Sequence, residues 1–452
     1  MGGQGRPKVS ANGRQEWLKE LGQPSGRFFA AYAARVRAEG GAIAAAQEAV
    51  TLLTPAVDWP AYLPHIPHGL LGLQGVFRLR PLLAESSFLR VLGTQLHAFA
   101  VEARSPAGHG LGAIGQGSGN WANLTMALDS HRSSIAWGEA LGLAEPSAAD
   151  FRRLESRAEP DMANVGHKAV TARALGELNA ALGARPEAGR PLLALCAWLC
   201  ASEPFDTFWH DRAGHRLGGA VPVPFRPAQA DPAELAAGVR EICDSGLVDL
   251  LDGFAGRVRA GTGSGDLLAT LVLAAAEKQL DARRDLEGKT AWNFVFLATL
   301  AKRVAETGQG APESWVQAAA LVNLFPTGEE EERPRPSPPR MPGLGDGEGL
   351  LDAILDGDAQ PAMFLAKELL AGAGPDRLLQ VLAEAASGND PAFNHCHQLL
   401  AVAAAADLAP LLPAPVLAVM LVALAKFLGN CQGSSDLGRL ADAALKGTPG
   451  SS

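Results

Sequence analysis

The chain has 452 residues, a net charge of −9 and an aromatic content of only 6%. An acidic chain without a basic cluster is a poor match for nucleic acid, because phosphate binding depends on concentrated Lys and Arg. Ala and Leu dominate and β-branched runs are few, which predicts an all-α fold.

Five cysteines form no CxxC pair, and this favours a reduced, cytoplasmic compartment. The N-terminal residues are polar and do not resemble a secretory signal. The most apolar window, residues 399–428, is interrupted by Asp407 and three prolines, so it lacks the about 20 uninterrupted apolar residues of a spanning helix. We therefore expect neither a membrane nor a nucleic acid as partner.

Four segments follow one another along the chain. Residues 1–25 are expected to form a flexible arm, and residues 26–325 a helical body with apolar residues at helical spacing. Residues 326–349 carry an acidic run followed by several prolines, which predicts an exposed, mobile linker. Residues 350–446 are expected to form a further helical repeat that packs on the same body. Within the body, helical patterning is found at 28–38, 42–53, 70–83, 88–101, up to 182, 192–201, 232–260, 267–280, 291–305 and 315–325.

Two stretches of the chain are similar to each other. Residues 260–276 and 371–387 align without a gap, and in each a glycine-rich turn leads into an apolar helix. Internal repetition of this kind is typical of helical repeat architectures. We therefore expect repeated helical pairs packed around a central pocket.

Histidines recur near the predicted helix starts. Positions i, i+3, i+4 and i+7 of a helix share one face, and this places His68 and His167 on faces of small and apolar residues. His395 and His397 begin a later helix but point about 200° apart, so one of them is expected to reach the site. Imidazoles from separate helices can converge on one metal ion. For each histidine, a core residue bonded to a carbonyl is the alternative. Most of the others are expected at the surface or in loops: His65, His97, His109, His131, His210 and His215.

Three segments, taken as an ordered set, resemble the questin oxidase-like family. They are His68-Gly-Leu-Leu-Gly-Leu73, Gly166-His-Lys-Ala-Val-Thr-Ala172 and Phe393-Asn-His-Cys-His397, and the resemblance covers roughly residues 50–430. Members of this family are oxygenases that open anthraquinone-type polyketide rings. Some bind a mononuclear non-haem iron through histidines on separate helices and a carboxylated lysine, whereas others are NADPH-dependent monooxygenases of the Baeyer–Villiger type.

The resemblance implies Fe(II) as cofactor, with His68, His167 and either His395 or His397 as ligands. The chain departs from the pattern at the third histidine, because no histidine lies between 215 and 395 and Lys289 stands near that place. A carboxylated Lys289 would keep an oxygen donor in the site and act as a catalytic residue. An ordinary surface lysine is the alternative.

Trp292 and Phe296, one helical turn apart and near Lys289, are predicted to stack against a flat aromatic substrate, with core packing as the alternative. The predicted function is an iron-dependent oxygenase that uses dioxygen to oxidise or cleave an aromatic polyketide or quinone ring. A non-catalytic helical module that binds a ligand or a protein is the first alternative. An NADPH-dependent monooxygenase of the same family is the second.

Overall fold

The computed structural model describes residues 25–38, 40–56, 68–103, 111, 114–202, 208–282, 286–325, 347–388, 396–431 and 436–447. Most of these residues are helical, so the all-α prediction is confirmed. Two short strands, β1 and β2, form one antiparallel pair with Val223 opposite Gly310. The predicted arm up to residue 24 and residues 326–346 of the predicted linker lie outside the described residues. No described helix has the length and apolar character that crossing a membrane requires.

The elements have the following bounds in chain order: α2 Ser25–Arg37, α3 Gly41–Leu53, η1 Thr54–Ala56, α4 His68–Leu79, η2 Arg80–Leu82, α5 Glu85–Glu102, α6 Trp121–Asp129, α7 Ser133–Gly142, α8 Ala148–Ala158, α9 Ala163–Ala181, α10 Pro186–Ala201, α11 Phe208–Leu217, β1 Val223–Pro224, α12 Pro232–Asp244, α13 Leu247–Arg259, α14 Ser264–Asp281, α15 Glu287–Thr307, β2 Gln309–Gly310, α16 Pro312–Leu324, α17 Glu348–Leu355, α18 Ala359–Ser387, α19 His397–Leu408, η5 Ala409–Leu411, α20 Ala414–Asn430 and α21 Asp436–Lys446.

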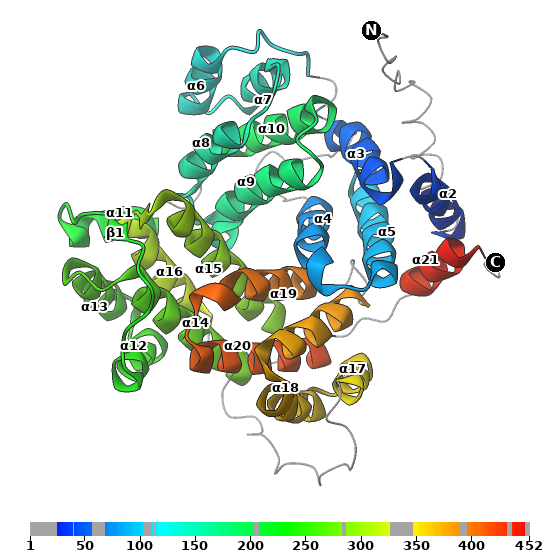
Figure 1. Cartoon of the computed structure of the whole chain (residues 1–452). Helices are drawn as coiled ribbons and strands as arrows, with labels where there is room; N and C mark the ends of the chain where they lie inside the picture. The colour runs from blue at the N-terminus through cyan, green and yellow to red at the C-terminus, as the bar shows by residue number, and fades with distance from the viewer. Residues whose placement is uncertain are drawn as a thin grey trace, which may run out of the picture.

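Helices α4, α9, α15 and α19 lie toward the middle of the molecule, and the other helices surround them (Figure 1). Each of these four helices packs against two of the others, so that α4, α9, α15 and α19 form a closed ring. Each ring helix also packs against the α-helix that follows it in the chain: α4 against α5, α9 against α10, α15 against α16 and α19 against α20. The C-terminal α21 packs on α2 and α5, so the last segment of the chain contacts the first helices.

Aromatic and imidazole rings join the four helices at one end of the ring. His68 of α4 contacts His167 of α9 and His397 of α19. Trp292 of α15 contacts both His167 and His397. All four neighbouring helix pairs therefore meet through residues near their N-terminal ends.

Charged residues join the same helices at the other end. Arg78 of α4 forms an ion pair with Asp407 of α19. Lys302 of α15 lies 2.9 Å from Asp407 and 2.6 Å from Glu177 of α9, and Gln74 of α4 donates to Glu177. Because the same helix pairs meet at both ends, the four helices run in the same direction. About 15 Å separates the two ends at 1.5 Å per residue.

Apolar side chains fill the ring between its two ends. Leu71, Val170, Val295 and Leu400 line a cavity of about 10 Å³ together with the charged residues below them. Such a cavity has room for about one water molecule. The middle of the ring is therefore packed.

Glycines allow α4 to approach its neighbours closely. A Cβ atom added at Gly69 would lie 2.5 Å from Cα of Phe99 in α5, and one added at Gly72 would lie 2.0 Å from Oε1 of Gln95. These glycines therefore allow the close approach of α5 to α4.

Gly69→Ala is expected to lower the free energy of unfolding by about 1 to 3 kcal/mol, because the new methyl group meets the backbone of Phe99 and overpacking carries a cost of this size. Gly256→Ala is the matched control. Nothing lies within 4 Å of its added Cβ in α13, so alanine should stabilise that helix by about 0.5 to 1 kcal/mol. Urea titration of both variants measures the difference, and equal midpoints would contradict the expectation.

Two turns differ from the pattern that the sequence suggests. The stretch 232–260 divides into α12 and α13, because the backbone is extended at Ser245 and Gly246. In the second copy of the sequence repeat, the turn is reduced to one non-helical residue, Gly374, at φ 83° and ψ 177° inside α18. Pro375 follows it and lacks the N–H that would continue the helix.

Candidate metal centre

Three imidazoles converge at the N-terminal end of the ring. The ring centroid of His68 lies 5.6 Å from those of His167 and His397, which are 6.2 Å from each other. One ligand nitrogen from each lies within 4.8 Å of the other two. His167 is buried and the other two are half-buried. His395, the predicted alternative to His397, lies outside the described residues.

Left-handed backbone precedes two of the three histidines. Val165 and Gly166, at φ 56° and 77°, come before His167, and Cys396, at φ 57°, comes before His397. A positive φ is an outlier for a β-branched residue and persists only where the surroundings hold it. The backbone that aims His167 into the cluster is therefore maintained by the residues that pack on this turn.

Two aromatic residues of α15 pack on the turn before His167. Nε1 of Trp292 donates to the carbonyl oxygen of Val165 at 2.9 Å, and its ring stacks on the His167 imidazole with centroids 3.6 Å apart and planes at 8°. A Cβ atom at Gly166 would lie 2.6 Å from Cε2 of Phe296. Trp292 and Phe296 are both buried here, and their contact with a substrate stays a prediction.

The start of α19 is bonded to both of its neighbours in the ring. Sγ of Cys396 donates to the carbonyl oxygen of His68 at 3.1 Å, and Nδ1 of His397 lies 3.1 Å from the carbonyl oxygen of Gly288 in α15. A carbonyl oxygen only accepts, so Nδ1 carries the proton and the lone pair is on the buried Nε2. Metal-binding imidazoles are commonly oriented by a carbonyl in this way.

Glu102 bonds the first turn of α4. Its carboxylate accepts a hydrogen bond of 2.9 Å from the backbone N–H of Gly69 and another from that of His68. Burial raises the pKa of Glu102 to about 7, and the two backbone hydrogen bonds oppose that rise. A side chain at the C-terminus of α5 thereby fixes the position of His68, and sequence periodicity gave no signal for it.

Two buried ion pairs flank the cluster. Lys168, the residue after His167, lies 2.6 Å from Asp161, and each side chain is less than 5% exposed. Glu287 in the first turn of α15 is fully buried and lies 2.8 Å from Lys426 of α20. These pairs attach the starts of α9 and α15 to surrounding elements.

Lys289 has a different environment from the histidines. It lies in the first turn of α15 with an exposed side chain, next to the buried Gly288 and Thr290. This exposure favours the surface-lysine alternative, and carboxylation of Lys289 stays a prediction. On α15, the residue that contacts His167 and His397 is Trp292.

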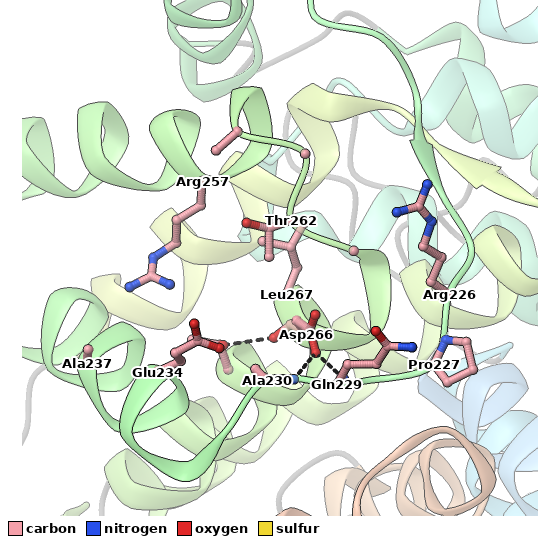
Figure 2. Close-up of a pocket in the computed structure, with 14 residues that line it drawn as sticks. Arg226, Pro227, Gln229, Ala230, Glu234, Ala237, Arg257, Thr262, Asp266 and Leu267 are labelled. Atoms are coloured by element: carbon pink, nitrogen blue, oxygen red, sulfur yellow. Dashed lines mark hydrogen bonds between the residues drawn. The ribbon is translucent and has the colours of Figure 1, made fainter.

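A surface groove of about 450 Å³ lies elsewhere, between α12, α13 and the start of α14. Figure 2 shows Arg226 and Arg257 at its two sides and Asp266 at its base, where the carboxylate accepts from the backbone N–H groups of Gln229 and Ala230. The groove shares no residue with the histidine cluster. The Asp266 carboxylate thereby bonds the loop before α12 to the start of α14.

Comparisons with protein-family models, with curated proteins and with solved structures found no match for this chain.

Proposed function

We propose that His68, His167 and His397 bind one divalent transition-metal ion and that the protein is a metal-dependent oxygenase. The observation that supports the site is the convergence of three ligand nitrogens within 4.8 Å of one another. Three atoms so spaced share a point within about 2.8 Å of each, and metal–nitrogen bonds are about 2.1 Å long. An inward movement of less than about 1 Å would close the site around an ion.

The donor set fits an ion with open coordination positions. In the described part of the chain, no Asp, Glu or Cys joins the three histidines in this group. The hydrogen bond from Nδ1 of His397 to the carbonyl oxygen of Gly288 leaves Nε2 with the lone pair that a metal ion needs. Three neutral imidazoles suit Fe(II) and also Zn(II), so metal identity has to be measured.

The packed layers of the ring bear on the direction from which an organic substrate would approach. The apolar layer with Leu71 and Leu400, and the charged layer with Lys302 below it, close the ring toward its C-terminal end. We propose that the substrate approaches from the N-terminal side and that it is an aromatic polyketide or quinone, as the family resemblance implies. A bound Fe(II) ion would supply electrons to dioxygen and a positive charge for a phenolate or enolate oxygen.

We also propose that the ring is the product of repeated helical pairs. Each ring helix packs with the next α-helix in the chain, as α4 does with α5 and α19 with α20. This arrangement would give every ring helix the same direction and bring equivalent residues to one end. The turn before α14 and the kink at Gly374 would then be outer features of two such units.

Oxygen consumption tests the proposed function. The protein is reconstituted anaerobically with Fe(II) and mixed with oxygenated buffer that contains hydroxyanthraquinones or simpler quinones. We expect uptake of dioxygen that depends on the quinone, and a His397→Gln variant should reduce it at least about hundredfold because a ligand is lost. Tight binding of Fe(II) without oxygen uptake for any quinone would contradict the oxygenase, and the metal site would then need another chemistry.

A further inference from the structure

Trp292 stands on α15 where the other ring helices carry a histidine. Trp292 and Lys302 are ten residues apart, as are His68 and Arg78 on α4. The same spacing separates His167 from Glu177 on α9 and His397 from Asp407 on α19. In each pair, the first residue belongs to the contacts among imidazole and indole rings at the N-terminal ends of the helices. The second residue belongs to the charged layer at the other end.

The residues between these two ends keep the same register. On each helix, an apolar residue follows the histidine or Trp292 by three positions. These four apolar residues line the same small cavity: Leu71, Val170, Val295 and Leu400. Three layers therefore match on all four helices. The matching makes Trp292, and not Lys289, the structural counterpart of the three histidines.

We propose that Trp292 sets the number of protein ligands at three by occupying the position of a fourth. This inference rests on the metal site proposed above. An indole N–H is a donor only and has no lone pair for a metal. Here that N–H is bonded to Val165, and the ring covers one face of His167. The side of the site at α15 is thereby closed by an apolar wall.

Because the four backbones share one register, an imidazole introduced on α15 at this position would reach the same point as the other three. Trp292→His would then create a site with four nitrogen donors, whereas Trp292→Phe keeps an apolar ring without a donor. Co(II) serves as the probe, since its visible absorption reports the number and geometry of its ligands. Titration of both variants and the wild type gives the affinities.

We expect Trp292→His to bind Co(II) at least about tenfold more tightly than Trp292→Phe. We also expect the visible bands of Trp292→His to differ from those of the wild type, because the added imidazole raises the number of nitrogen ligands on Co(II). A more demanding test is rescue. His68→Ala alone should weaken Co(II) binding at least about hundredfold, and the double variant with Trp292→His should return to within about tenfold of the wild type.

The outcomes separate this inference from the metal site itself. If the wild type binds Co(II) but Trp292→His matches Trp292→Phe in affinity and spectrum and fails to rescue His68→Ala, the role of Trp292 is wrong and the three-histidine site stands. If neither the wild type nor any variant binds Co(II), the metal site is wrong and the inference with it. Binding by Trp292→His alone would support the ring position and overturn the wild-type site.

Loss of the stacking contact with His167 could unfold Trp292→His, so circular dichroism accompanies each titration. Trp292→Cys provides an independent variant with a smaller side chain. A thiolate at this position should add a sulfur-to-cobalt absorption in the near ultraviolet that the wild type lacks. A folded Cys variant without this band would overturn the inference.

Discussion

His167→Gln is expected to weaken Co(II) and Fe(II) binding at least about hundredfold, equivalent to about 2.7 kcal/mol of binding free energy. His167 is buried, it stacks on Trp292, and its nitrogen lies within 4.8 Å of ligand atoms of two further imidazoles. Glutamine is close in size but replaces a nitrogen donor by a neutral amide. Equilibrium titration against a competing chelator gives the affinity.

His97→Gln is the control for this variant. His97 is a half-buried histidine of α5 whose ring stacks on Phe29 at 5.6 Å and meets Phe28 edge-on, and it is not part of the cluster. We expect its metal affinity to equal that of the wild type within about twofold. Equal affinities of the two glutamine variants would show that the metal binds somewhere else.

Asp161→Asn is expected to cost about 3 to 5 kcal/mol of unfolding free energy. Asp161 and Lys168 form an ion pair at 2.6 Å with each side chain less than 5% exposed. Removal of one partner leaves a buried charge without compensation, and such losses are of this size. Because Lys168 follows His167 directly, metal affinity should fall with stability. Guanidinium titration of the metal-free protein measures the stability term alone.

Asp436→Asn is the control that tests whether the loss of unfolding free energy in Asp161→Asn comes from the burial of its ion pair. Asp436 pairs with Arg439 at 3.0 Å, but the two side chains are 77% and 65% exposed. An exposed pair of this kind contributes about 0 to 1 kcal/mol. A loss of similar size in the two Asp variants would contradict the assignment of the large effect to the buried pair.

Helical periodicity predicted most of the elements because long apolar patterns determine which face of a helix is buried. The turns were less predictable. The similarity of residues 371–387 to residues 260–276 predicted the same helix–turn–helix in both. In the structure, the turn of the second copy consists of one non-helical residue, Gly374, within α18. The closed ring could not be foreseen, because it depends on which helices pack together. The polar residues that join its far end, such as Arg78 and Asp407, lie on otherwise apolar stretches.

The histidines of the candidate site could be predicted, because imidazole is a common metal ligand and is recognised from the residue type alone. Imidazoles on buried helix faces identified His68, His167 and His397 as candidates, and the structure brings these three together. The choice between His397 and His395 could not be made, because α19 begins directly after Cys396, and no periodicity reveals the left-handed backbone of that residue. On α15, the sequence analysis selected Lys289 because it can bear a ligand atom. Trp292 occupies the position equivalent to the histidines, but an indole ring is not a metal ligand and gave no signal. The ten-residue spacing to a charged side chain was the signal that could have found it.

Metal content is the most direct test of the central claim. The protein is purified anaerobically, supplied with Fe(II), desalted and measured by elemental analysis beside a variant in which His68 and His167 are both alanine. We predict about one iron per chain in the wild type and less than about a tenth as much in the variant. The absence of a stoichiometric metal from the wild type after reconstitution, or equal amounts in both proteins, would contradict a metal centre at the three histidines. Absence would leave a helical protein that binds its partner without metal chemistry.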